Sequence, residues 1–150
     1  MRRFTLLVVL VAAACRTVPM STSQGGAASP KAAIDRFIGA ANAQDVQALL
    51  SAWGDEKGSR RERSSNKDQR TEDERAAIVL ICHLKNTAYT IQDSNPIAGG
   101  RTIADVDISQ GTNKARVRFT VARAPSAGFF VADFDIITLQ HAGFCSQKKS

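Results

Sequence analysis

Apolar residues in the first half of the chain recur at helical spacing in three separate stretches. The first stretch begins at Ser29-Pro30, an N-cap residue followed by proline at the first helical position. Its apolar positions are Ala33, Ile34, Phe37, Ile38 and Ala41. Asp45 is placed to cap a second, short helix, and Thr71 with Glu74 forms a capping box that opens a third. We expect the third helix to be the most buried, because its apolar run is nearly continuous.

After Leu84 the apolar period changes from 3.6 residues to two, which predicts strands. A first strand begins at Tyr89 and ends at Asn95-Pro96. Two longer strands alternate apolar with charged positions on either side of a hairpin turn over residues 110–113. A final strand runs from about Phe129 to Leu139. We therefore predict an α+β domain whose N-terminal helices pack on the apolar face of a curved four-stranded antiparallel sheet.

The two longer strands specify their own register. If Ser109 lies opposite Lys114, aspartates face arginines on one side of the sheet and apolar residues face one another on the other. The predicted pairs are Asp107 with Arg116, Asp105 with Arg118, Val106 with Val117, and Ala104 with Phe119. In the next pair of strands we expect Val121 opposite Phe130. This places Asp133 beside Arg118 and Asp135 beside Arg116, so that all four aspartates lie on the polar face.

The first fifteen residues have the form of an export signal. Arg2 and Arg3 precede an apolar run from Phe4 to Ala14. As a helix this run reaches roughly 16 Å, about half of a bilayer's hydrocarbon core, so it is too short to span a membrane and is typical of a signal peptide. The three alanines before Cys15 resemble the bacterial lipoprotein signal, in which lipid is attached to the cysteine. The alternative is ordinary cleavage after Ala14, which leaves Cys15 as a free thiol.

These features predict four parts of the chain. They are a signal peptide (1–14), a lipidated cysteine with a flexible tether (15–28), a single domain (29–146) and a disordered tail (147–150). We expect a protein of the bacterial cell envelope that faces the periplasm and is held in the membrane through lipid on Cys15. The outer membrane is favoured, because Arg16 and not an aspartate follows that cysteine.

Composition and charge exclude several classes of protein. Hydrophobic residues make up 43% of the 150-residue chain and charged residues 23%, unlike a disordered tail or a polytopic membrane protein. Removal of Arg2 and Arg3 with the signal lowers the formal charge from +6 to +4. No basic stripe accompanies this charge, so we expect no nucleic-acid partner.

Three cysteines in an exported chain indicate one modified thiol and one bridge. With Cys15 lipidated, we expect Cys82 and Cys145 to form a disulfide; the alternative is two separate buried thiols. The two histidines, His83 and His141, have no ligand spacing to a third group, so we expect no metal ion. Since no phosphate loop or nucleophile motif occurs, we expect no cofactor and no catalytic residue.

Residues 55–70 contain almost no apolar side chain but include Arg60, Arg61 and Arg63. One interpretation is a contact with an anionic surface, such as lipid headgroups or lipopolysaccharide. The interpretation we favour is a solvated, mobile loop, because acidic residues lie nearby. These are Asp55, Glu56, Glu62 and Asp68.

The order of helix, short helix, long helix and four antiparallel strands resembles the nuclear transport factor 2-like superfamily, an α+β cone of the cystatin-like class. The likeness covers residues 29–145 and is closest to small secreted and lipid-anchored bacterial members of unknown function. The residues that carry it are Ser29-Pro30, Ala33, Phe37, Ala41, the stretch from Asp45 to Trp53-Gly54, Cys82, Tyr89, Phe119-Thr120-Val121, Gly128-Phe129-Phe130-Val131 and Cys145. The resemblance implies a cone that often encloses a pocket, used by some relatives for isomerase, cyclase or dehydratase chemistry and by others for binding or dimerisation.

Aromatic residues are the candidate lining of such a pocket, and the alternative is that they simply fill a core. They are Phe37, Trp53, Phe119, Phe130 and Phe134. Because no catalytic arrangement carries over, we expect a non-enzymatic module that binds an apolar small molecule or another envelope protein, as a monomer or a homodimer. The alternative is a pocket enzyme of the isomerase or dehydratase kind.

Overall fold

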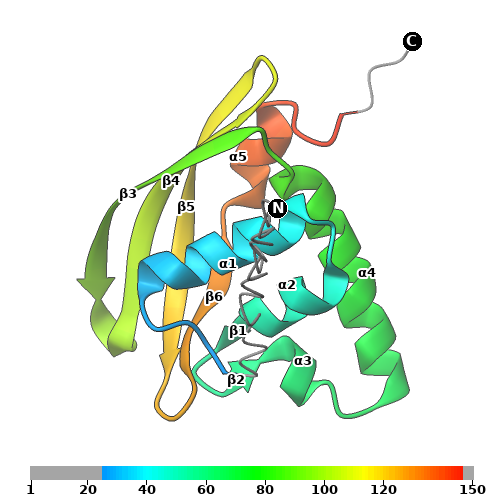
Figure 1. Ribbon diagram of the computed structural model, residues 1–150, viewed down its shortest axis with the longest axis vertical. Helices are drawn as coiled ribbons and strands as arrows, with labels where there is room; N and C mark the ends of the chain where they lie inside the picture. Colours follow the sequence, from blue (N-terminus) through cyan, green and yellow to red (C-terminus); the bar gives the residue numbers. More distant parts are fainter. Residues whose placement is uncertain (1–24, 147–150) are drawn as a thin grey trace, which may run out of the picture.

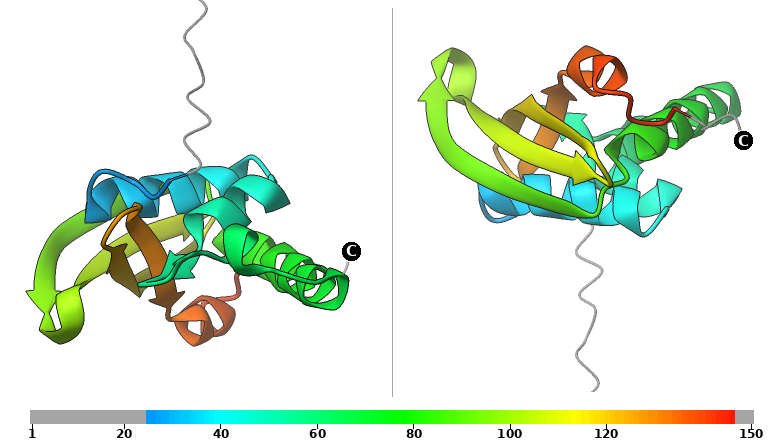
Figure 2. Two further views of the ribbon diagram at one scale, coloured as in Figure 1. Left: turned by 90° about the horizontal axis from the view of Figure 1, so that it is seen from below. Right: turned by 90° about the horizontal axis from the view of Figure 1, so that it is seen from above.

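The computed structural model describes residues 25–146. The predicted signal peptide, the candidate lipidation site Cys15 and the tail 147–150 lie outside the described residues. The main helices are α1 (Pro30–Asn42), α2 (Val46–Ala52) and α4 (Lys67–Leu84), and they precede a four-stranded antiparallel sheet (Figure 1). A short helix, α5 (Ile136–His141), follows the last strand; Figure 2 shows α1 across one face of the sheet and α5 on the side away from α1. The predicted α+β class is confirmed.

The first two helices begin at the residues that the sequence marks. The Ser29 hydroxyl accepts a hydrogen bond from the backbone N–H of Ala32 (3.2 Å), and the Asp45 carboxylate accepts one from Ala48 (2.9 Å). These side chains satisfy N–H groups that have no partner inside the helix. The buried face of α1 contains every predicted position together with Ala40.

Helix α4 begins earlier than predicted and is less buried. Its N-cap is Asn66, whose side chain accepts a backbone N–H bond in the first turn (2.8 Å), so the predicted capping box at Thr71 is wrong. The Thr71 hydroxyl instead donates to the Lys67 carbonyl (3.0 Å). Ile78 and Val79 are 58% and 53% exposed, so the expectation of the most buried helix is also wrong. A helix at the edge of a domain buries only the side that meets the rest of the fold. None of the helices in the described part of the chain has the length and hydropathy needed to cross a membrane.

The sheet has the order β3-β4-β5-β6, and every neighbouring pair is antiparallel. Its strands are β3 (Ala88–Ile97), β4 (Arg101–Gln110), β5 (Asn113–Ala124) and β6 (Gly128–Phe134). The predicted register of β4 and β5 is confirmed at every pair, from Ser109 with Lys114 to Ala104 with Phe119. Strand β3 continues through Asn95-Pro96, where we predicted its end. Proline is tolerated there because β3 is an edge strand.

The register of β5 and β6 differs from the predicted one by one residue from Val121 onward and by two residues at Phe119 and Thr120. Val121 lies opposite Val131 instead of Phe130, and the ladder shifts next to Thr120. Asp133 consequently faces Thr120, so its predicted place beside Arg118 is wrong. An irregularity of this kind changes which residue of a strand faces which neighbour, and regular alternation cannot predict it.

The last strand is shorter than predicted and is followed by a helix. Strand β6 ends at Phe134, and Asp135 caps α5 by accepting hydrogen bonds from the N–H and the hydroxyl of Thr138 (3.1 and 2.7 Å). The predictions of a strand to Leu139 and of Asp135 beside Arg116 are therefore wrong. Over so few residues the apolar pattern suits a strand and a helix equally, and the capping carboxylate decides between them.

The core lies between the helices and the sheet, and a disulfide closes one end of it. Large side chains from α1, β5 and β6 are completely buried there, including Phe37, Phe119 and Val131. The predicted Cys82–Cys145 disulfide is confirmed, with the two Cα atoms 5.1 Å apart. It joins the last turn of α4 to the segment that follows α5.

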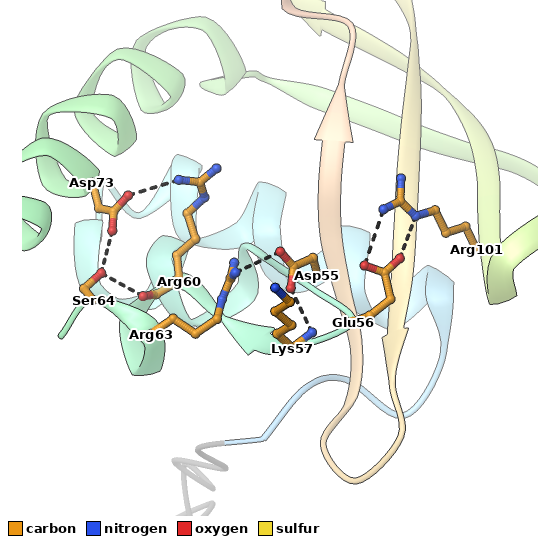
Figure 3. Close-up of polar contacts among 8 residues, drawn as sticks. All are labelled: Asp55, Glu56, Lys57, Arg60, Arg63, Ser64, Asp73 and Arg101. Atoms are coloured by element: carbon orange, nitrogen blue, oxygen red, sulfur yellow. Dashed lines mark hydrogen bonds and ion pairs between the residues drawn. The ribbon is translucent and has the colours of Figure 1, made fainter.

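The charged segment 55–70 forms regular structure, so its prediction as a loop is wrong, although most of its residues are exposed to solvent as predicted. It contains the last residue of β1 (Gly54–Asp55), then β2 (Gly58–Ser59), α3 (Arg60–Arg63) and the start of α4. Figure 3 shows three ion pairs of this region: Arg60 with Asp73 (3.1 Å), Arg63 with Asp55 (2.9 Å) and Arg101 with Glu56 (2.6 Å). The Ser64 hydroxyl also lies within hydrogen-bond distance of the buried Asp73 carboxylate. Ion pairs therefore join charges of this segment to one another, to α4 and to β4.

Candidate functional site

An open groove of about 740 Å³ lies on the polar face of the sheet. Its floor is made by side chains of β4 and β5, and its wall by the end of β6 and the first turn of α5. The floor residues are Asp105, Arg116, Arg118 and Thr120, and the wall residues are Asp133, Phe134, Asp135, Ile136 and Ile137. The wall exists because the chain leaves the sheet after Phe134 and turns into α5.

Two cross-strand ion pairs lie at the floor. Arg116 holds Asp107 through two hydrogen bonds, from Nε to Oδ1 at 2.7 Å and from Nη2 to Oδ2 at 3.1 Å. This guanidinium lowers the pKa of Asp107, mainly through its hydrogen bonds. Arg118 Nε donates to Asp105 Oδ1 at 3.1 Å. Both arginine side chains are about two-thirds exposed (65% and 64%), and pairs this exposed contribute little to stability and open readily.

Two further carboxylates come from the wall. The Thr138 hydroxyl donates to Asp135 Oδ2, and this hydrogen bond is the main reason that the pKa of Asp135 is lowered. Asp133 accepts a hydrogen bond from the N–H of Phe134 (2.9 Å) and has no ion-pair partner within residues 25–146. The groove thus brings together three carboxylates and two guanidiniums.

The wall also exposes an apolar side chain. Ile137 is 58% exposed, and Ile136 and Phe134 are half-buried beside it. Protein interfaces commonly combine an apolar contact with a polar, charged surround. The chemistry of the groove is therefore suited to a segment of another protein.

Sequence reasoning placed the floor of the groove and the two wall aspartates, Asp133 and Asp135, on the polar face, but it missed the helix that completes the wall. The register of β4 and β5 placed Asp105, Arg116 and Arg118 on the polar face, whereas Ile137 was assigned to a strand. Two signals mark the short helix that carries Ile137. Asp135 is an N-cap residue, and Gly143, with a φ of +80°, occupies a position typical of a helix C-terminal end.

The candidate pocket residues pack largely against one another. The ring centroids of Phe37, Phe119 and Phe134 lie 5.4 to 6.5 Å apart. Phe130 is completely buried, and Trp53 is half-buried with the Arg60 guanidinium 3.9 Å from its ring centroid. Phe134 also lines the groove, so its ring separates the core from the polar face.

No family model, no curated protein and no solved structure matches the chain. Within residues 25–146 the protein is an α+β domain in which four helices precede a four-stranded antiparallel sheet and one disulfide joins α4 to the C-terminal segment. Its candidate functional site is the charged groove.

Proposed function

We propose that this chain is a lipid-anchored protein of the bacterial cell envelope whose domain binds another envelope protein through the groove, without enzymatic activity. The observation that carries the proposal is the groove itself, which combines five charged side chains with the exposed Ile137. Surfaces of this kind select partners by charge complementarity. We also propose that the domain is a small cone of the nuclear transport factor 2-like kind, and the order of its helices and strands supports this.

The ion pairs of the floor suit exchange with a partner. Arg116 and Arg118 are largely exposed and are paired with aspartates of the neighbouring strand. A carboxylate from a partner can take the place of Asp105 or Asp107 without any change in the core. An apolar ligand among the aromatic side chains would instead have to separate rings that are in contact, and close-packed interiors resist this. These observations favour a protein partner over an apolar small molecule.

The start of the described chain supports a position close to the membrane. Ala27 and Phe129 exchange two backbone hydrogen bonds (2.8 and 2.9 Å), so the chain enters the domain at the β5–β6 turn. A Cβ on Gly26 would lie 2.6 Å from the Ala127 carbonyl oxygen, and this close approach requires glycine. The chain from Cys15 to Gly25 can span at most about 35 Å. A lipidated Cys15 therefore holds the domain within reach of proteins at the membrane surface.

The binding function is tested by replacing Ile137 with benzoylphenylalanine in the full chain, in the bacterial envelope. Ile97 is the matched control, since it is also an exposed isoleucine (43%) but lies on the edge strand β3. We expect a discrete protein crosslink from position 137 that Arg116→Glu with Arg118→Glu abolishes. Crosslinks that are absent, or equal at the two positions, contradict the proposal. The mass of the product separates a second copy of this chain from another envelope protein.

A further inference from the structure

A second cavity, of about 290 Å³, lies between α2, α3 and α4. Its lining residues are Gln47, Leu50, Arg61, Ser64, Arg70 and Glu74. Arg61, Ser64 and Arg70 of this lining belong to the charged segment 55–70, and none of the lining residues lines the groove. The cavity and the groove are therefore separate sites.

The arginines around this cavity fall into two kinds. Arg60 and Arg63 each have a carboxylate partner, as Figure 3 shows. Arg61 and Arg70 have none within residues 25–146, and both line the cavity. Two guanidiniums on one cavity repel each other, and an anion between them would relieve that repulsion.

The two unpaired arginines are exposed, and each makes one contact with an uncharged group. Arg70 Nε donates to the Ser64 carbonyl at 3.0 Å, and its Nη groups make no hydrogen bond within the described residues. Arg61 Nη1 lies 3.4 Å from the Ser51 hydroxyl. Ser64 is itself fixed by the buried Asp73, so the ion-pair network of Figure 3 positions Arg70. Neither contact neutralises the charge of its guanidinium, and the one to Ser64 orients Arg70.

The remaining polar lining adds one amide and one carboxylate. Gln47 Nε2 donates to Glu74 Oε1 at 2.9 Å. Among the lining residues Glu74 carries the single negative charge, so the cavity retains one net positive charge. Removing the Glu74 charge would make the cavity more attractive to anions.

We propose that this cavity binds a phosphate group, carried either by a lipid headgroup or by a soluble phosphorylated compound. The planar guanidinium donates two parallel hydrogen bonds to phosphate oxygens, and two guanidiniums together balance a dianion. Gln47 lies at the same cavity and can donate to a further phosphate oxygen. The cavity shares no residue with the groove, so this proposal can be tested separately from the proposed protein-binding function.

The test is a titration of the full chain with inorganic phosphate, compared with sodium chloride at equal ionic strength. Nuclear magnetic resonance of the arginine Nε–H groups reports binding at Arg61 and Arg70. We expect Arg61→Gln or Arg70→Gln to weaken phosphate binding about tenfold, because each removes charge-assisted hydrogen bonds. Glu74→Gln has the opposite expected effect and tightens binding.

Arg75→Gln is the matched control, since Arg75 is an exposed arginine of the same helix that does not line the cavity. It removes the same charge and is expected to leave phosphate binding unchanged. Phosphate that acts no differently from chloride overturns the proposal. An equal loss of phosphate binding in Arg75→Gln and Arg61→Gln also overturns the proposal, because the loss would then come from the lower net charge of the protein and not from the cavity.

A second arm identifies the source of the phosphate. The full chain is mixed with phosphatidylcholine vesicles that contain or lack phosphatidic acid, and the phosphate titration is repeated. Competition by the lipid would appear as weaker phosphate binding when the vesicles contain phosphatidic acid. If phosphatidic acid weakens phosphate binding equally in the unsubstituted chain and in Arg75→Gln, but has no effect in Arg61→Gln, the cavity binds a lipid headgroup. An equal titration in both vesicles assigns it to a soluble phosphorylated compound. Arg61→Gln that still binds phosphate as the unsubstituted chain does overturns the site from either source.

Discussion

On the polar face of the sheet, Arg116 pairs with Asp107 where both side chains are largely open to solvent (65% and 40% exposed). In the charged segment, Arg60 pairs with Asp73, whose side chain is only 9% exposed. The two contacts have similar lengths, 2.7 and 3.1 Å, but they differ in what happens when they open. Water replaces the partner of Asp107 at once, whereas Asp73 would remain buried with the Ser64 hydroxyl as its one side-chain partner among the described residues.

This difference gives the same two residue types different roles. On the sheet the pairs leave their charges accessible, so a partner protein can bind them with little loss of stability. In the charged segment the Asp73 carboxylate joins Arg60 of α3 and Ser64 to α4. The first region is therefore suited to reversible contacts, and the second holds helices together.

The largest effect is expected at the disulfide that links α4, the helix that carries Asp73, to the segment after α5. Cys82 lies in α4, and Cys145 follows α5, whose first turn forms the wall of the groove. Replacing both by serine should lower the free energy of unfolding by about 4 kcal/mol, because the bridge closes a long loop in the unfolded chain. Urea denaturation measures this change. A loss below about 1 kcal/mol would mean that burial of Leu139 and Phe144 alone fixes the C-terminal segment.

A smaller loss of stability is expected from Asp73→Ala. It removes the buried carboxylate that Arg60 and Ser64 share, and should lower the free energy of unfolding by about 2 kcal/mol. Asp107→Ala is the matched control and should leave the urea midpoint within error, because its pair is exposed. Equal midpoints for the two variants would remove the distinction between the regions.

The parts of the fold that could be predicted from the sequence are those with local signals. Ser29 and Asp45 cap their helices by contacts within the next turn, so their role is visible in the residues themselves. The register of β4 and β5 could be predicted because one register pairs charged residues on one face of the sheet and apolar residues on the other. A slip of one residue would place apolar side chains opposite charged ones. The floor of the groove follows directly from that register.

The parts that could not be predicted depend on contacts between distant residues. Asp73 lies within a helix and is buried only because Arg60 and Ser64 reach it from a preceding segment. Charged residues are exposed on average, and composition alone does not show which of them will pair. The wall of the groove likewise depends on whether Asp135 continues a strand or caps a helix. The short apolar run after Asp135 is compatible with both structures, so it does not decide between them.

The smallest effect is expected when the pH is lowered, and it is confined at first to the wall of the groove. The Thr138 hydroxyl lowers the pKa of Asp135 below its usual value of 3.8. Because the folded-state pKa lies below the unfolded one, the cap stabilises α5 fully above pH 3.8 and loses this effect as the pH falls through the folded-state pKa. The amide resonance of Thr138 should therefore shift at acidic pH, while the core of α1 stays unchanged. Asparagine also caps helices but does not titrate, so Asp135→Asn should keep α5 and abolish this shift. If the Thr138 amide resonance of Asp135→Asn still shifts at the same pH as in the unsubstituted chain, a group other than Asp135 causes the shift.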